Sequence, residues 1–158
     1  MEKNIIDRRV EILKAEGIKF KLNTNVGVNY KIEKLKDFDA IVLCGGATKS
    51  RSLPTPGINS DGVVQAMEFL TQQTKVLMGK KVGNQVLATD KNVIVIGGGD
   101  TGSDCVGTSN RQGAKSVTNF EIMPKPPGHR SPQTPWPYWP LQLKTSSSHK
   151  EGCERNWL

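Results

Sequence analysis

The sequence predicts an α/β fold with parallel strand pairing, because helical and strand-like patterns alternate along the chain. The clearest evidence is an apolar β-branched run at residues 93–96, followed at once by three glycines and a helical pattern. A second strand pattern follows at residues 116–122. A strand, a glycine turn, a helix and another strand in this order predict a βαβ unit of the Rossmann type.

The first third of the chain predicts one helix and two strands. Residues 5–16 carry apolar side chains at helical spacing, and Gly17 stands where a helix stop is expected. Residues 18–22 alternate as a half-buried strand does. Residues 30–37 predict a short helix or a loop, and residues 38–43 form a compact apolar run typical of a strand buried on both faces.

Two further helices are expected around a connecting segment. Residues 51–62 are rich in Pro and Gly, which is typical of a linking stretch, and residues 64–75 are again helical in pattern. The helix after the glycines is expected over residues 100–112, with Gly113 as its stop.

The segment beyond Met123 is crowded with prolines, which exclude a regular helix or a central strand. Trp136, Tyr138 and Trp139 lie among them. One interpretation is an extended polyproline-type ligand for a partner module. The other is a long ordered loop whose aromatic side chains pack on a protein body, and we favour it because several prolines fall outside a PxxP spacing.

Charge and composition exclude several classes of protein. The 158 residues carry a formal net charge of +7, but Lys and Arg are scattered, so nucleic-acid binding is not predicted. An apolar run of about 18 residues and a signal-peptide pattern are both missing, so we expect a cytoplasmic protein without membrane contact. Cys44, Cys105 and Cys153 are too far apart for a disulfide framework or a metal site, and the first two are expected to be small buried hydrophobes.

The strongest functional motif is a GxGxxG fingerprint between the predicted strand and helix. Gly97 is expected to make the tight turn, Gly99 to let a pyrophosphate approach the backbone, and Gly102 to let helix and strand pack closely. The helix start offers unpaired N–H groups and the positive end of its dipole to the phosphates. The candidate cofactor-binding residues are Gly97, Gly98, Gly99, Asp100, Thr101 and Gly102.

Glu121 lies 19 residues after Gly102, where an acidic residue is expected to meet the adenosine ribose hydroxyls. Its carboxylate would favour NADH, because it repels the 2′-phosphate of NADPH. Lys125 and Arg130 follow closely and would instead pair with that phosphate. The cofactor is therefore left open between NADH and NADPH, with a preference for NADH, and an exposed strand-end carboxylate remains the alternative for Glu121.

No residue is predicted to act as an acid, a base or a nucleophile, or to bind a metal. His129 and His149 stand alone in polar loop sequence and are expected at the surface. The serines at 146–148 predict a loop. Asp100 and Asp104 suit the helix start, where a carboxylate interacts well with the helix dipole.

Several long runs carry a resemblance to a known family: KNVIVIGGGDTGSDCVGTSNRQGAKSV, DAIVLCGGATKSRSLPTPG, MEFLTQQ, FEIMPKPP, PWPYWP and TSSSHKEGCERNW. Together they cover nearly the whole chain, and they resemble the small (beta) subunit of glutamate synthase. The resemblance implies parts of two Rossmann-like domains, one holding FAD and one holding NAD(P)H. It also implies hydride transfer from NAD(P)H to FAD and electron transfer through iron–sulfur clusters to a large subunit that makes glutamate. Similar flavoproteins serve other electron acceptors.

The resemblance also implies a domain division. Residues 1–50 match a remnant of the FAD-binding domain, residues 51–90 an inter-domain linker with a helix, and residues 91–158 the N-terminal part of the NAD(P)H-binding domain with its Pro/Trp-rich tail. The segment expected to touch flavin is Gly45, Gly46, Ala47 and Thr48.

The family's FAD fingerprint and cysteine-rich segment have no counterpart in the sequence. We therefore expect a fragment that does not transfer hydride alone. A non-catalytic nucleotide-binding or interaction module is the alternative. Exposed sheet edges predict strand pairing between copies and hence a homo-oligomer.

Overall fold

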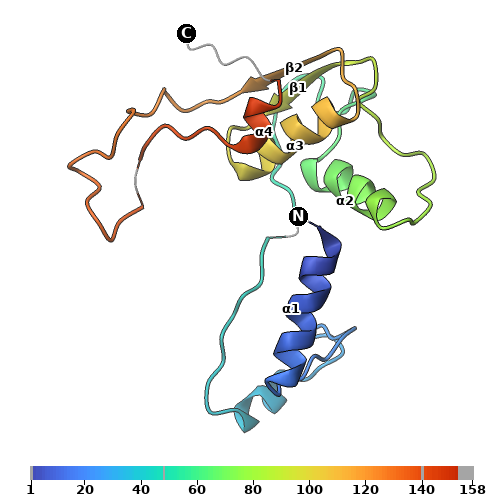
Figure 1. Ribbon diagram of the computed structural model, residues 1–158, viewed down its shortest axis with the longest axis vertical. Helices are drawn as coiled ribbons and strands as arrows, with labels where there is room; N and C mark the ends of the chain where they lie inside the picture. The colour runs from blue at the N-terminus through green and yellow to red at the C-terminus, as the bar shows by residue number, and fades with distance from the viewer. Residues whose placement is uncertain (1, 48, 140, 153–158) are drawn as a thin grey trace. The chain divides into compact units, whose positions relative to one another are not determined.

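The computed structural model describes residues 2–47, 49–139 and 141–152, and the chain forms two compact units, Met1–Lys49 and Ser50–Leu158. The elements in chain order are α1 (Lys3–Ala15), the 3₁₀ helix η1 (Ile32–Asp37), α2 (Ala66–Leu77), β1 (Asn92–Ile96), α3 (Asp100–Arg111), β2 (Ser116–Phe120) and α4 (Ser147–Lys150) (Figure 1). Within the described ranges, no helix is both long enough and apolar enough to cross a bilayer.

The first unit contains the predicted helices but not the predicted strands. Helix α1 ends before Gly17, whose φ of +91° confirms the expected helix stop, and η1 confirms a short helix within residues 30–37. Residues 18–22 and 38–43 form no strand, so both strand predictions are wrong.

The missing strands have a physical reason. A strand needs a neighbouring strand to satisfy its backbone N–H and C=O groups. Within the described part of the first unit, strand-type pairing is limited to an isolated bridge between Val26 and Tyr30. The run at 38–43 is therefore not buried as predicted: Leu43 is 89% exposed, and Cys44 beside it is also exposed.

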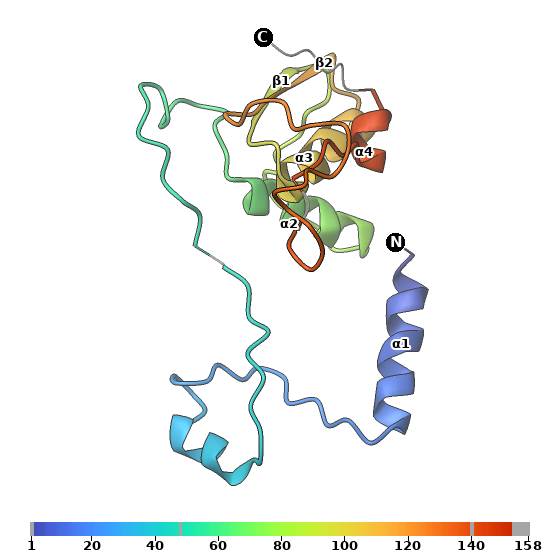
Figure 2. The same ribbon diagram turned by 90° about the vertical axis from the view of Figure 1, so that its left-hand side faces the viewer.

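The second unit contains the predicted βαβ arrangement. Strands β1 and β2 pair in parallel, in a register that runs from Asn92 opposite Ser116 to Ile96 opposite Phe120. Helix α3 connects them and packs on both strands, and it stops before Gly113, which has a φ of +80°. Helices α2 and α4 each pack on α3, as the second viewing direction also shows (Figure 2).

The core of the second unit lies where α2, α3 and β1 meet. Its buried apolar members are Phe69, Ala88, Val95, Cys105 and Val106. The segment predicted as a linker, residues 51–90, supplies two of them and thus belongs to the second compact unit. The assignment of the units to FAD and NAD(P)H domains stays a prediction.

Polar side chains also hold residues 51–90 against the rest of the second unit. Gln112 is the C-cap residue of α3. Its side-chain oxygen accepts a hydrogen bond from the backbone N–H of Ala88 at 2.8 Å, and its side-chain nitrogen donates one to Gln73 Oε1 at 2.7 Å. A single amide therefore links α3 to α2 and to the stretch before β1.

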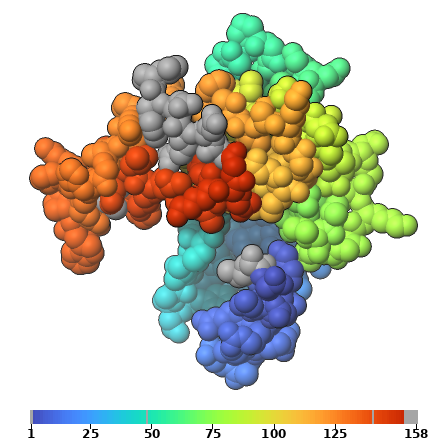
Figure 3. Space-filling view, turned by 45° about the horizontal axis from the view of Figure 1, so that its top comes forward, coloured from blue at the N-terminus to red at the C-terminus, as the bar shows by residue number. Residues whose placement is uncertain are grey.

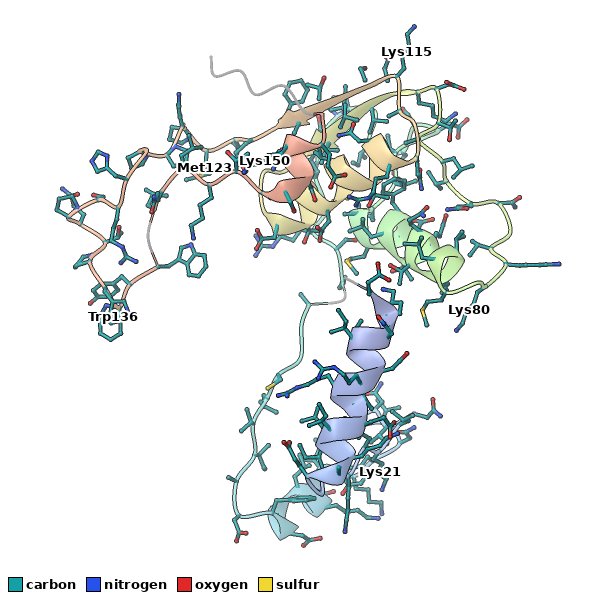
Figure 4. The ribbon with its side chains drawn as sticks, in the orientation of Figure 1. Lys21, Lys80, Lys115, Met123, Trp136 and Lys150 are labelled. Carbon is teal, nitrogen blue, oxygen red and sulfur yellow. The ribbon has the colours of Figure 1, made fainter. Side chains whose placement is uncertain are left out.

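The proline-rich tail is a long loop, as its composition predicts. Trp136 and Trp139 are 83% and 82% exposed, and Trp136 lies at the far end of the loop, away from the sheet (Figure 4). Both interpretations of this loop stay predictions.

The two described cysteines should differ sharply in reactivity. Burial raises the pKa of the Cys105 thiol from 9.0 to about 11, and the Asp104 carboxylate adds to the effect. Two pKa units lower the thiolate fraction about a hundredfold, and the thiolate is the reactive form. In a Cys153→Ser background, a disulfide reagent at pH 8 should modify Cys44 quickly and Cys105 only on unfolding.

The Cys44→Ser variant of that background is the control, and it should react only when urea unfolds the chain. Rapid modification of Cys105 in the folded chain would show that the core around α3 is open.

Candidate functional site

The candidate site begins where the chain leaves β1. Gly97 has a φ of +116°, in the left-handed region that favours glycine, and its N–H donates to the carbonyl oxygen of Phe120 at 2.8 Å. The turn therefore starts at the carboxyl ends of both parallel strands. This edge of an α/β sheet is the usual place for ligands.

Gly99 stands at the N-cap of α3 with an extended backbone, and no side chain caps it. A Cβ atom added there would meet nothing within 4 Å. The first N–H groups of a helix have no partner within the helix. Open space beside these donors is suited to an anion, and the helix dipole favours negative charge there.

Gly102 allows α3 to approach the strand. A Cβ atom at Gly102 would lie 3.0 Å from the carbonyl carbon of Gly97, closer still to its oxygen, and 3.7 Å from Val95 Cγ1. A larger residue would push the start of the helix away from β1. The three glycines therefore have the geometry that their spacing predicts: Gly97 makes the turn, Gly99 leaves open space, and Gly102 allows the close contact with the strand end.

Glu121 lies directly after β2 and reaches the glycine turn. One carboxylate oxygen, Oε2, accepts a hydrogen bond from the Gly98 N–H at 2.6 Å, and Oε1 accepts one from the Met123 N–H at 3.1 Å. A side chain at Gly98 would collide with this carboxylate. The structure therefore brings Glu121 to the turn, while Asp100 and Thr101 lie exposed in the first turn of α3.

The other predicted site residues are not gathered at this turn. Lys125 and Arg130 are exposed in the proline-rich loop, and Arg130 Nη1 donates to the carbonyl oxygens of Thr134 and Tyr138 at 3.1 and 3.3 Å. Three of the residues expected to touch flavin lie exposed in the first unit: Gly45, Gly46 and Ala47. Two further residues named above, Thr48 and Cys153, lie outside the described residues.

The structure corrects the prediction that His149 lies at the surface. This residue is only 8% exposed, whereas His129 is exposed as predicted. The serines predicted as a loop form the start of α4, where Ser146 is the N-cap and accepts a hydrogen bond from the His149 N–H.

Small residues on α3 allow α4 to pack closely against it. A Cβ atom at Gly107 would lie 2.8 Å from Ser148 Cβ, and α4 (red) lies directly against the neighbouring surface in the space-filling view (Figure 3). The run of Gly, Ser and Thr in α3 was the available indication of a packed face. Because the partner helix is about 40 residues away, helical periodicity alone did not reveal it.

Among the described residues, no three His, Cys, Asp or Glu side chains gather as a possible metal site.

Comparison with known proteins agrees with the fingerprint. Residues 1–133 match the family described as Pyridine nucleotide-disulphide oxidoreductase. The "Glutamate synthase [NADPH] small chain" of Mycobacterium tuberculosis strain H37Rv is 50% identical over 98% of this chain and 33% of its own length. The corresponding small chain of Bacillus subtilis is 46% identical over 96% of this chain and 31% of its own length.

A fungal relative is named for the other cofactor. The "Glutamate synthase [NADH]" of Schizosaccharomyces pombe is 44% identical over 96% of this chain and 7% of its own length. The chain thus spans about a third of the bacterial small chains and a much smaller share of the fungal protein.

Two glycine substitutions should differ in how strongly they destabilise the fold. Gly102→Ala should lower the free energy of unfolding by about 1–3 kcal/mol or more, because the new methyl group meets backbone that cannot rotate away. Gly99→Ala should change it by less than about 1 kcal/mol, because the space is open and alanine is only a poorer N-cap. Urea unfolding followed by circular dichroism measures both. Equal losses would contradict the close contact between Gly102 and Gly97.

Proposed function

Since the chain belongs to the pyridine nucleotide-disulphide oxidoreductase family, we propose that its glycine turn holds the pyrophosphate of NADH or NADPH in a glutamate synthase small chain. The open N-terminus of α3 carries the proposal. Gly99 leaves space beside the first N–H groups of the helix, and Gly102 holds that helix end at the carboxyl edge of the sheet.

The chemistry of the complete protein comes from its cofactors. When bound, the nicotinamide supplies a hydride and FAD accepts it. The residues of this chain bind and orient the dinucleotide: backbone N–H groups at Gly99 and the start of α3 face the pyrophosphate, while the Gly98 N–H holds the Glu121 carboxylate. The sequence resemblance and the names of the relatives support glutamate synthesis with a large subunit as the final use of the electrons.

Glu121 is the residue we assign to cofactor choice. Its carboxylate, at the Gly98 N–H, is placed to accept hydrogen bonds from the adenosine ribose hydroxyls and to repel a 2′-phosphate. Arg130 is a weaker candidate for binding that phosphate, because its guanidinium already bonds two carbonyl oxygens of the loop. We therefore propose NADH as the preferred cofactor.

Other parts of the proposal concern the complete protein. Gly45, Gly46, Ala47 and Thr48 are proposed to meet FAD, and the expected location is cytoplasmic. A homo-oligomer through strand pairing is supported by the two-stranded sheet, because within the described residues β1 and β2 each pair on one side only.

Binding of NADH should perturb the amide signals of residues 97–104 in a ¹H–¹⁵N spectrum of the chain. Gly99→Val should weaken binding at least about tenfold, or about 1.4 kcal/mol, because the branched side chain fills the space beside the α3 N-terminus. Gly83→Val is the matched control, since Gly83 is also unhindered but lies far along the chain from the turn. Equal affinities for the two variants, or no binding by the parent chain, would refute the proposal.

Replacing Glu121 should change the cofactor preference. Glu121→Gln keeps an oxygen for the Gly98 N–H but removes the charge, so the ratio of NADPH to NADH affinity should rise about tenfold. Parallel titrations of the parent chain and of Glu121→Gln with NADH and NADPH measure the ratio. An unchanged ratio would leave Glu121 as a strand-end carboxylate without a role in selection.

A further inference from the structure

A chain of four hydrogen-bonded polar side chains runs from α3 through α4 to β2, where it reaches the glycine turn. Ser103 and His149 are 4% and 8% exposed. The Ser103 and Ser146 hydroxyls are hydrogen-bonded to each other, Ser146 Oγ lies 2.8 Å from His149 Nδ1, and His149 Nε2 lies 3.3 Å from Asn119 Oδ1. These residues come from α3, α4 and β2, so the chain joins all three elements.

The direction of each hydrogen bond follows from Asn119. Its Nδ2 lies 3.0 Å from the carbonyl oxygens of both Val95 and Gly97. Carbonyl oxygens only accept, so the amide NH₂ faces them and the amide oxygen faces His149. Because that oxygen also only accepts, His149 must carry a proton on Nε2.

The remaining bonds follow in sequence. In the neutral imidazole that carries its proton on Nε2, Nδ1 accepts a hydrogen bond from the Ser146 hydroxyl. Ser146 Oγ is then free to accept from the Ser103 hydroxyl and from the His149 N–H. Every donor in the chain has an acceptor, and the bonds run in one direction from α3 through α4 to the glycine turn.

The last hydrogen bond of the chain, from Asn119 to the Gly97 carbonyl, holds the peptide between Gly97 and Gly98 at the proposed cofactor turn. The Gly97 carbonyl and the Gly98 N–H belong to one planar peptide and point in opposite directions. Asn119 holds the carbonyl, so it also fixes the direction of the Gly98 N–H, which reaches Glu121 at 2.6 Å. If the Asn119 amide changed its orientation, the Gly97–Gly98 peptide would turn and the Gly98 N–H would point in a different direction.

We propose that His149 is a positioning residue of the dinucleotide site: by fixing the Asn119 amide, it aims the Gly98 N–H at Glu121 and so holds the carboxylate to which cofactor choice is assigned. The role in cofactor binding rests on the function proposed above, whereas the effect on the turn is independent of any ligand. A residue of α4 thereby tunes a site formed by β1 and α3.

The test compares three variants of the chain. His149→Leu removes both ring nitrogens, while His149→Gln keeps an N–H donor for Asn119. Glu151→Gln is the matched control, because it breaks the ion pair to Arg111 that also ties α4 to α3, at 2.7 Å, without touching the polar chain. The readouts are the Gly98 amide signal without ligand, the NADH dissociation constant and the thermal midpoint.

His149→Leu should shift the Gly98 amide and weaken NADH binding about tenfold. His149→Gln should restore most of both, and Glu151→Gln should change neither, even where it lowers the thermal midpoint. An unchanged Gly98 amide in His149→Leu, or an equal shift in Glu151→Gln, would overturn the inference. Failure of the parent chain to bind NADH would instead overturn the proposed function.

The ring nitrogens of the parent chain give a test that needs no variant. ¹⁵N shifts of His149 should show a proton on Nε2 and a bare Nδ1, as the bond directions require. A proton on Nδ1 alone would overturn the inference even if His149→Leu failed to fold.

Discussion

The contact between Gly102 and the Gly97 carbonyl is the constraint on which the second unit depends. It sets how closely the start of α3 approaches the end of β1, and only glycine fits there. The helix that starts at this contact packs on both strands, on α2 and on α4. The geometry of the cofactor turn and the packing of the unit are therefore consequences of one close backbone approach.

Polar side chains contribute much of the order of the second unit, because the apolar core formed by its described residues is small. Among the described residues, five buried apolar side chains form it, and Val106 is the one of these five that is completely shielded. Gln112 and Asn119 each make hydrogen bonds to segments distant in the chain. Such partly buried hydrogen bonds add modest net stability but make misplacement costly, since a lost partner leaves a partly desolvated polar group. The unit thus relies on hydrogen bonds for its specific arrangement.

Local patterns predicted the parts of this structure that depend on local interactions. The spacing of Gly97 and Gly102 predicted the turn and the close packing, and helical periodicity predicted α2 and α3. The 19-residue spacing after Gly102 predicted a carboxylate for the adenosine ribose, which stays a prediction, and the structure places Glu121 at the Gly98 N–H. Features that need a distant partner were missed: residues 38–43 found no neighbouring strand, and His149 is buried because α4 packs on a face of α3 far from it in sequence.

The register of the sheet connects these observations. Asn119 and Glu121 are two residues apart, so their side chains extend to the same side of the strand direction, and both reach the Gly97–Gly98 peptide. One holds its carbonyl and the other its N–H. A slip of one residue from the observed pairing of Val95 with Asn119 would turn both away at once. Strand pairing therefore does more than support the helix: it fixes both ends of the peptide on which the proposed cofactor contact depends.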